Sequence, residues 1–333
     1  MLPELPSDPY YVEPSPANPL WLRDPGPAGA MVVREHVTAA AVDGRTPRVG
    51  EHTSRSLSKA NFDDIYDRAD PRAYFCELAA LDYEVPRHGQ QVFRGVLDTL
   101  AARDPTVVDL CCSYGINAAL LGHDLELSDL YDRYCGEQTT GLSRDELVAA
   151  DRAFYAARRC PDAPTVIGVD VASQAVDYAL DVGLLDTGAA EDLEQHDPSP
   201  ELAREVARAD LITVTGGIGY ITERTFERVL DCTSPDRRPW VAGLCLRTVP
   251  YTPIAAALAR KGLVTERLEG RTFPQRRFAD QQERDYALRT LVTRGIDPQG
   301  KESEGAYHVE VYLSRPAVAV AQQPINAMFA DLL

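Results

Sequence analysis

Short apolar runs alternate along this chain with longer stretches of helical periodicity. The runs are rich in β-branched and aliphatic residues, and they occupy 106–110, 165–170, 210–215, 240–246, 263–269 and 307–313. Strand-length runs separated by helices are typical of βαβ units, which build a mostly parallel sheet with helices on both faces. We therefore predict an α/β fold, and such sheets bind their ligands outside the carboxyl ends of the strands.

The residues before the first strand are expected to be helical. Pro71 suits the first turn of a helix that runs to about residue 81, and a further helix over 88–102 would place Val92, Phe93 and Val96 on one face. We predict that 60–103 forms an N-terminal helical lid over the ligand edge of the sheet. The preceding residues, 1–59, begin with many prolines and are expected to form a proline-rich extended arm.

The remaining residues, 104–333, are predicted to hold the sheet. The stretch between Gly115 and Asp170 is far longer than one helix and a turn require, and it contains helical, acidic and aromatic segments. We interpret about 123–163 as a helical insertion. Insertions on the ligand side of a sheet often carry specificity, although a plain surface excursion explains this one equally well.

The charge balance restricts the class of partner. The chain carries 51 acidic and 34 basic residues, for a formal net charge of −17. Binding to nucleic acid requires a basic face, so we expect no nucleic-acid partner. The arginines at 267, 271, 276 and 277 are interpreted as a solvated surface. A small-molecule substrate is the better expectation.

Cysteine spacing and hydropathy exclude several further classes. The seven cysteines form no C-x-x-C pair, so we expect neither a disulfide framework nor a metal site. The sequence shows neither a secretory leader nor a run of 18 apolar residues, and we expect a cytoplasmic protein without a membrane partner.

Two acidic residues lie near the ends of predicted strands. The first strand ends at Asp109-Leu110, and a turn of mostly small residues leads through Gly115 into a helix, which brings backbone N–H groups to the sheet edge. The second strand ends at Asp170, whose carboxylate can accept both hydroxyls of a ribose. Asp170 would alternatively cap the helix that begins near Ser173.

These segments resemble the motifs of class I S-adenosylmethionine (SAM)-dependent methyltransferases. VDLCCSYG at 108–115 is similar to V-D-L-G-C-G-x-G, and GVD at 168–170 is similar to the end of the family's second strand. AEDL at 190–193 resembles the acidic loop that meets the adenine, and 210–220 resembles the fourth strand and the loop beneath the reacting methyl. The resemblance implies a Rossmann-like, mostly parallel seven-stranded sheet and SAM as cofactor.

The resemblance also implies which residues form the site. Cofactor binding is expected at Asp109, Cys111, Ser113, Gly115, Asp170, Val171, Glu191, Asp192, Leu193, Thr215, Gly216 and Gly217. Catalytic or substrate-facing roles are expected for Tyr220, Asn117 and Tyr66. Tyr66 belongs to the aromatic lid, where rings attract the sulfonium cation, and Asn117 would hydrogen-bond the methionine tail.

The first motif departs from the family pattern in its glycines. Cys111 and Ser113 stand where the family has glycine, and Tyr114 follows them. We expect this segment to distinguish the protein from an ordinary methyltransferase. A nucleophilic cysteine has a mechanism at a helix N-terminus, but packing is the favoured role because no histidine lies nearby in sequence.

The predicted activity is in-line methyl transfer from SAM to a small-molecule acceptor of secondary metabolism. The cofactor is already a strong electrophile, so no charge-relay constellation is required. One alternative is a synthase that cyclises SAM to azetidine-2-carboxylate and methylthioadenosine, with Ser113, Asn117, Thr215 and Tyr220 holding the amine. Another is a non-catalytic scaffold. The acceptor stays open, as does the oligomeric state, for which a homodimer is one option.

Overall fold

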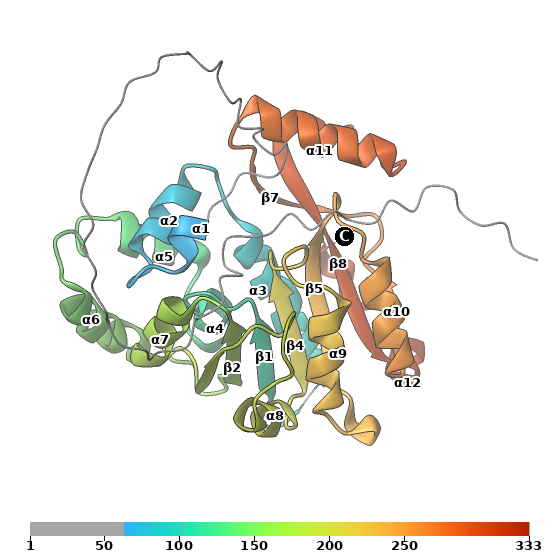
Figure 1. Cartoon of the computed structure of the whole chain (residues 1–333), viewed down its shortest axis with the longest axis horizontal. Helices are drawn as coiled ribbons and strands as arrows, with labels where there is room; N and C mark the ends of the chain where they lie inside the picture. Colours follow the sequence, from blue (N-terminus) through green and yellow to red (C-terminus); the bar gives the residue numbers. More distant parts are fainter. Residues whose placement is uncertain (1–62, 101, 333) are drawn as a thin grey trace, which may run out of the picture. The chain divides into compact units, whose positions relative to one another are not determined.

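A single mixed sheet organises the part of the chain that the structure describes. The computed structural model describes residues 63–100 and 102–332. The predicted arm at 1–59 and the first residues of the predicted lid lie outside the described residues. Within them the sheet has eight strands, seven of which follow the order β3-β2-β1-β4-β5-β8-β6, while β7 pairs with β8 beside this path (Figure 1).

The strands confirm the predicted α/β fold. β1 to β5 pair in parallel, and β8 runs antiparallel to β5, β6 and β7. The bounds are β1 Thr106–Leu110, β2 Thr165–Asp170, β3 Thr187–Ala190, β4 Leu211–Thr215, β5 Trp240–Leu246, β6 Leu263–Arg267, β7 Phe273–Arg277 and β8 Ala306–Pro316.

The predicted number of seven strands was wrong by one. The predicted strand ranges included neither β3 nor β7, and the residues of β7 lie in an arginine-rich run of the sequence. The reason is tertiary: β8 is 11 residues long and extends far enough to pair with β7 as well as with β5 and β6.

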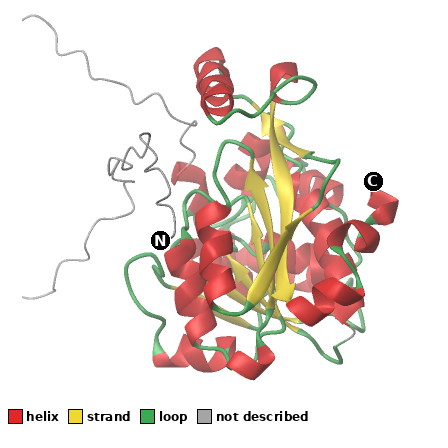
Figure 2. Cartoon of the chain, turned by 90° about the vertical axis from the view of Figure 1, so that its right-hand side faces the viewer, coloured by secondary structure: helices red, strands yellow, loops and turns green. Residues whose placement is uncertain are grey.

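Helices cover both faces of the sheet (Figure 2). Before the insertion and within it lie α1 Asp63–Tyr66, α2 Arg72–Ala79, α3 Val85–Leu100, α4 Ile116–Gly122, α5 Leu127–Cys135 and α6 Arg144–Ala156. The later ones are α7 Ser173–Asp181, α8 Pro200–Val206, α9 Glu223–Asp231, α10 Thr252–Arg260, α11 Gln281–Thr293, α12 Ala317–Gln322 and α13 Ile325–Met328. Short 3-10 turns occupy Pro235–Arg237, Glu302–Glu304 and Ala330–Leu332. Over residues 63–100 and 102–332, no helix combines the length and apolarity needed to cross a membrane.

Strand alternation divides the buried side chains between two cores. Val107 faces the core formed with α2 to α7, whereas its neighbour Val108 faces the core formed with α8, α9 and α10. Both valines are fully buried. Successive side chains of a strand point to opposite faces, so a short run of valines contributes to both cores and the parallel strands become a rigid central layer.

The segment predicted as an insertion contains α5 and α6, and a buried carboxylate anchors it. Asp151 on α6 is fully buried and accepts hydrogen bonds from Arg133 Nε at 2.6 Å and Tyr134 Oη at 2.7 Å. It also accepts one from Tyr178 Oη of α7. The segment is therefore joined to the sheet domain through α7.

The strand order has its switch point between β1 and β4. The chain proceeds from β1 through β2 to β3 on one side and continues from β4 through β5 on the other, so the connections diverge at the carboxyl ends of β1 and β4. In Figure 1, α1 and α2 rise beyond this edge on one side, and β7 and α11 do so on the other. Open α/β sheets bind ligands at such a point.

Candidate functional site at the carboxyl edge of β1 and β4

The loop after β1 has left-handed backbone at two positions where the resembling motif has glycine and this chain does not. Cys111 has φ 58°, Ser113 has φ 48° and Gly115 has φ 75°. Left-handed backbone costs a residue with a Cβ roughly 1–2 kcal/mol, so the two substituted positions store strain. The loop is held by the N–H groups of Cys111 and Cys112, which donate to the Val169 carbonyl at 2.8 and 3.3 Å.

Asp170 fastens this loop from the end of β2. Its Oδ2 accepts from the Ser113 N–H at 2.8 Å, and its Oδ1 accepts from the Ala172 N–H at 3.0 Å. The N-cap of α7 is Ala172, so Asp170 is not the N-cap of that helix. A carboxylate offers about four acceptor positions, which leaves capacity for a ligand on both oxygens. Burial raises the pKa of Asp170 although its backbone hydrogen bonds lower it.

The loop after β4 approaches the first loop because it lacks side chains. A Cβ added to Gly217 would lie 2.6 Å from Cys111 Sγ, and one added to Gly216 would lie 3.0 Å from Tyr83 Oη. Gly216 also has φ 76°, which favours glycine. The two loops of the switch point therefore meet closely, and the hydroxyl of Tyr83 lies against Gly216 on the side where a side chain would stand.

A buried polar cluster supports both loops from below. Asp109 is fully buried, and its Oδ1 accepts from Asn117 Nδ2 at 2.9 Å and from Thr213 Oγ1 at 2.7 Å. Asn117 Nδ2 also donates to Thr215 Oγ1 at 3.1 Å. The amide of Asn117 thus joins the end of β1 to the end of β4. Burial raises the pKa of Asp109 to about 7, although these hydrogen bonds oppose the shift.

Tyr114 connects the first loop to the lid, a role that sequence reasoning missed. Its hydroxyl accepts from the Arg68 N–H at 2.8 Å and lies within hydrogen-bond distance of the carbonyls of Ile65 and Arg68, at 3.1 and 3.0 Å. Ile65 belongs to α1, and Arg68 lies in the turn between α1 and α2. The substituted motif therefore carries a side chain that holds the lid.

Aromatic rings cluster beneath the lid. The ring of Tyr74 makes edge contacts with Tyr66 at 5.5 Å, Tyr83 at 6.3 Å and Tyr114 at 5.9 Å between centroids. Burial is the largest cause that raises the pKa of Tyr66, and Tyr83, Tyr220, Arg276 and Asp170 are close enough to act on it electrostatically. The structure thus brings Tyr66 near Asp170 and Tyr220, as the predicted site requires.

In the loop predicted to meet the adenine, the acidic side chains accept hydrogen bonds from nearby residues of the same segment. Glu191 accepts from the N–H and the hydroxyl of Ser199 at 2.9 and 2.6 Å, which holds the start of α8. Asp192 Oδ1 accepts from the N–H groups of Glu194 and Gln195 at 2.9 and 3.2 Å. Leu193 is buried. These contacts shape the loop after β3.

Two predicted site residues are exposed at this edge. Val171, directly after Asp170, is 42% exposed, and Tyr220 is 41% exposed. The Tyr220 N–H donates to the Gly217 carbonyl at 2.9 Å, which closes the turn after β4. An apolar side chain and a phenol therefore face outward on either side of the switch point.

The prediction of a solvated arginine run was wrong at Arg276. Arg267, Arg271 and Arg277 are exposed, but Arg276 is 2% exposed and pairs with Glu283 of α11, also 2% exposed, through bonds of 2.6 and 2.9 Å. The register between β7 and β8 shifts between Pro274 and Arg277. A β-bulge breaks the alternation of a strand, which explains why consecutive side chains are buried here.

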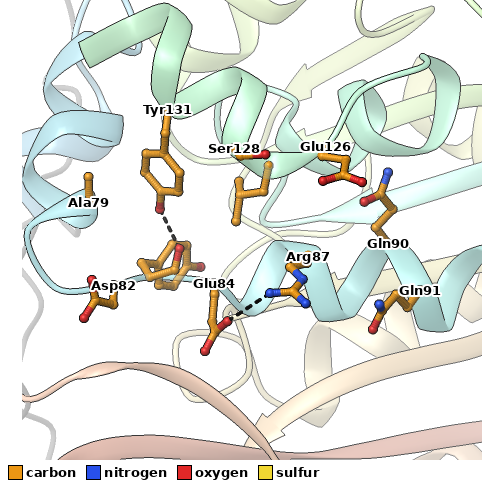
Figure 3. A pocket seen from close by; sticks show the side chains of 11 residues that line it. Ala79, Asp82, Glu84, Arg87, Gln90, Gln91, Glu126, Ser128 and Tyr131 are labelled. Carbon is orange, nitrogen blue, oxygen red and sulfur yellow. Dashed lines mark hydrogen bonds and ion pairs between the residues drawn. The ribbon is translucent and has the colours of Figure 1, made fainter. Parts of the chain in front are cut away.

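A separate polar pocket lies on the outer side of the lid (Figure 3). Its volume is about 700 Å³, and it is lined by Ala79, Asp82, Tyr83, Glu84, Arg87, Gln90, Gln91, Glu126, Leu127, Ser128 and Tyr131. Tyr131 Oη donates to the Tyr83 carbonyl at 2.5 Å across it. Tyr83, which also belongs to the aromatic cluster beneath the lid, lines this pocket, whereas none of the residues predicted to bind the cofactor or to be catalytic does.

The cysteines of the first loop are suited to packing. Burial, reinforced by Asp170 and Asp109, raises the pKa of both Cys111 and Cys112 well above the ordinary value, so both are neutral thiols near pH 7. A nucleophilic cysteine needs the opposite shift. In residues 63–100 and 102–332, no group of three or more His, Cys, Asp or Glu side chains is arranged to hold a metal ion.

Comparison with known proteins finds similarity in solved structures alone. No family model and no curated protein sequence matches the chain. A TehB-like SAM-dependent methyltransferase from Corynebacterium glutamicum shares 16% identity over 66% of this chain and 84% of that chain, with a TM-score of 0.33. The YcgJ protein from Bacillus subtilis shares 11% identity over 69% of this chain and 99% of that chain, with a TM-score of 0.40.

A third similar structure is the magnesium protoporphyrin IX methyltransferase from Synechocystis, solved with bound SAM. It shares 14% identity over 68% of this chain and 79% of that chain, with a TM-score of 0.32. At such identities and TM-scores, these likenesses assign neither a family nor an activity to the chain. The site itself offers a carboxylate at Asp170, a loop with the paired glycines Gly216 and Gly217, and an aromatic lid at one sheet edge.

Proposed function

We propose that this protein binds SAM at the carboxyl edge of β1 and β4 and transfers the methyl group to a small-molecule acceptor. The observation that carries the proposal is the left-handed backbone at Cys111 and Ser113, where the resembling motif has glycine. Strained conformations persist where the surroundings over-determine them, and they cluster at ligand sites. Cys111 and Ser113 replace two glycines of the motif, but the loop keeps the backbone shape that glycine allows.

The surrounding residues fit this cofactor. Asp170 has acceptor capacity for the two ribose hydroxyls, and the exposed Val171 next to it offers an apolar surface to the adenine. Ser113 Oγ is buried and has no hydrogen-bond partner among the described residues, which suits a polar group of the methionine tail. Gly216 carries no side chain, which suits a close approach of the sulfonium end to the backbone beside Tyr83.

The chain's residues would act mainly by binding and positioning. When bound, SAM supplies an electrophilic methyl group, and alignment of the acceptor is the largest contribution that the protein can add. Tyr66, Tyr74 and Tyr83 would exclude water from the reacting atoms and place aromatic rings around the sulfonium. The position of Asn117 between Asp109 and Thr215 suits a positioning role.

Thermal unfolding with and without SAM tests the proposal. SAM at a hundred times its dissociation constant should add about 2.7 kcal/mol to the free energy of unfolding. Asp170→Asn should abolish most of this shift. Asp186→Asn is the matched control, since Asp186 also accepts a backbone N–H, from Val166 at 2.8 Å, but precedes β3 at the opposite end of the sheet. No shift for the unaltered protein would instead support the non-catalytic scaffold.

Cyclisation of SAM is a second candidate, and the orphaned Ser113 Oγ favours it. In that reaction the α-amine attacks the γ-carbon, the carbon–sulfur bond breaks, methylthioadenosine leaves and the amine loses a proton. Chromatography of the protein incubated with SAM separates the two activities. Methylthioadenosine formed without an acceptor would support cyclisation, whereas S-adenosylhomocysteine formed only with an acceptor would support methyl transfer.

A further inference from the structure

The bulge in β7 buries the side chain of Gln275, whose carbonyl oxygen lacks a hydrogen-bond partner in the described part of the chain. Gln275 is 1% exposed, and its Oε1 has no hydrogen-bond partner among the described residues. Its neighbour Arg276 is instead bound to Glu283. A buried carboxamide normally finds partners, and leaving it unpaired costs roughly 1–3 kcal/mol. An unpaired group in a native structure therefore requires an explanation.

Gln275 faces the loop after β4. Its Nε2 lies 3.7 Å from the position that a Cβ on Gly216 would occupy, and Tyr83 Oη lies 3.0 Å from the same position. Gly216 belongs to the segment that resembles the loop beneath the reacting methyl. Gln275 and Tyr83 thus provide the side-chain atoms nearest to the position of a Cβ on Gly216.

Backbone hydrogen bonds hold Gln275 in place relative to the lid. The Glu84 N–H donates to the Gln275 carbonyl at 2.9 Å, and the Arg277 N–H donates to the Leu81 carbonyl at 2.7 Å. The turn between α2 and α3 therefore runs alongside β7. A carboxamide on a fixed backbone can act as a specificity contact, because its position does not depend on a mobile loop.

The aromatic rings around this place favour a cation. Arg276 is paired with Glu283, and both Arg276 and Asp170 are close enough to Tyr66 to act on it electrostatically. The rings of Tyr66, Tyr74 and Tyr83 add faces that attract positive charge. Burial raises the pKa of Tyr83 to about 12, so its hydroxyl is neutral.

We propose that Gln275 is a specificity-determining residue that selects an amine-bearing acceptor, by accepting a hydrogen bond from that amine beside Gly216. This inference rests on the proposed function, since it takes the surroundings of Gly216 as the place where methyl donor and acceptor meet. No hydrogen bond among the described residues fixes either end of the carboxamide, so it can turn its oxygen toward the amine at no cost in protein contacts. The inference adds a residue from β7, which lies outside the motifs of the cofactor site.

A pair of cofactor analogues tests the inference without knowledge of the acceptor. Sinefungin carries an amine where SAM carries its reactive methyl, and S-adenosylhomocysteine carries no group there. We expect calorimetric titration of the full chain to show tighter binding of sinefungin. Gln275→Met, similar in volume but unable to accept a strong hydrogen bond, should weaken sinefungin binding about tenfold and change S-adenosylhomocysteine binding less than twofold.

Two further variants complete the test. Gln275→Glu keeps an acceptor oxygen and should retain the preference for sinefungin, whereas Gln299→Met makes the same side-chain change at an exposed position and should alter neither affinity. Equal losses for both ligands in Gln275→Met, or no loss for either, would overturn the inference and leave SAM binding intact. Failure of the unaltered chain to bind either analogue would overturn the proposed function and this inference together.

Discussion

At the scale of single residues, the site contains strained backbone and unpaired buried polar atoms, which lower the stability of the fold. Cys111 and Ser113 hold left-handed backbone, and Asp109 keeps one carboxylate oxygen buried without a hydrogen-bond partner among the described residues. Ser113 Oγ and Gln275 Oε1 are two further buried polar atoms at this edge that have no hydrogen-bond partner among the described residues. Sites of this kind are often strained or under-satisfied because they are shaped for a ligand rather than for stability.

The buried carboxyl of Asp109 makes stability depend on pH. Its pKa of about 7 lies above the value of about 3.9 for an unfolded chain, so folding retains a proton that the unfolded chain releases between these values. This contribution is complete below pH 4 and is lost as the pH rises to 7, by about 1.4 kcal/mol per pH unit.

Asp109→Asn removes this titration while keeping an acceptor oxygen for Asn117 and Thr213. The melting temperature of the variant should therefore rise relative to that of the unaltered protein between pH 5 and pH 7 and stay level from pH 7 to pH 8. Comparing the two proteins cancels the other titrating groups. A difference in melting temperature that is independent of pH would contradict the assigned shift.

At the scale of elements, the loops after β1 and β4 depend on each other. Gly217→Ala should lower the free energy of unfolding by about 1–3 kcal/mol, because the new Cβ would overlap the side chain of Cys111. Cys111→Gly removes that side chain and should rescue much of the loss. Urea denaturation of both single variants and the double variant measures the coupling, and strictly additive effects would show that the contact is absent.

The lid provides a second prediction at this scale. Tyr114→Phe removes the hydroxyl that binds the backbone of Ile65 and Arg68 but keeps the ring. We expect faster tryptic cleavage at Arg68, together with a stability loss of about 1–3 kcal/mol. Tyr155→Phe is a control, because it removes a tyrosine hydroxyl that contacts Tyr134 instead of the backbone of Ile65 and Arg68. Equal cleavage in both variants would contradict the role of Tyr114.

At the scale of the described chain, two cores share one sheet. The helices α8, α9 and α10 pack on one face, and most of the earlier helices pack on the other. A loss of packing on one face therefore destabilises the strands and, through them, the other core. This arrangement makes the carboxyl edge rigid, which suits a site whose main task is to position two reactants.

A large-to-small change in one core should therefore destabilise both. Phe226 on α9 is fully buried, and Phe226→Ala should cost about 3–5 kcal/mol. Far-UV and near-UV circular dichroism should show the same lowered urea midpoint, as expected for one cooperative unit. Val292→Ala, at a position that is 68% exposed, should change the midpoint little. Two separate transitions in Phe226→Ala would indicate cores that unfold independently.

Local sequence pattern determined the elements that alternate regularly. The strands at 106–110 and 240–246 were predicted with their observed bounds, because β-branched and apolar runs of that length carry their own signal. The same pattern placed Asp109 and Asp170 in neighbouring strands, where parallel register brings their carboxyl ends to one edge. The lid was predicted to be helical with a helix beginning at Pro71, but the turn between α1 and α2 depends on Tyr114, which is distant in sequence.

The sequence by itself therefore determined the mostly parallel sheet and the acidic residues at its carboxyl edge, because hydrophobic periodicity and strand ends are local properties. Only the tertiary structure decided that Cys111 and Ser113 adopt a glycine-like loop, that Arg276 is buried against Glu283, and that Gln275 faces Gly216. Each of these depends on pairing between distant segments, above all β7 with β8 and the first loop with the lid. No local pattern encodes such pairings, since their free energy arises only when the distant partners are brought together.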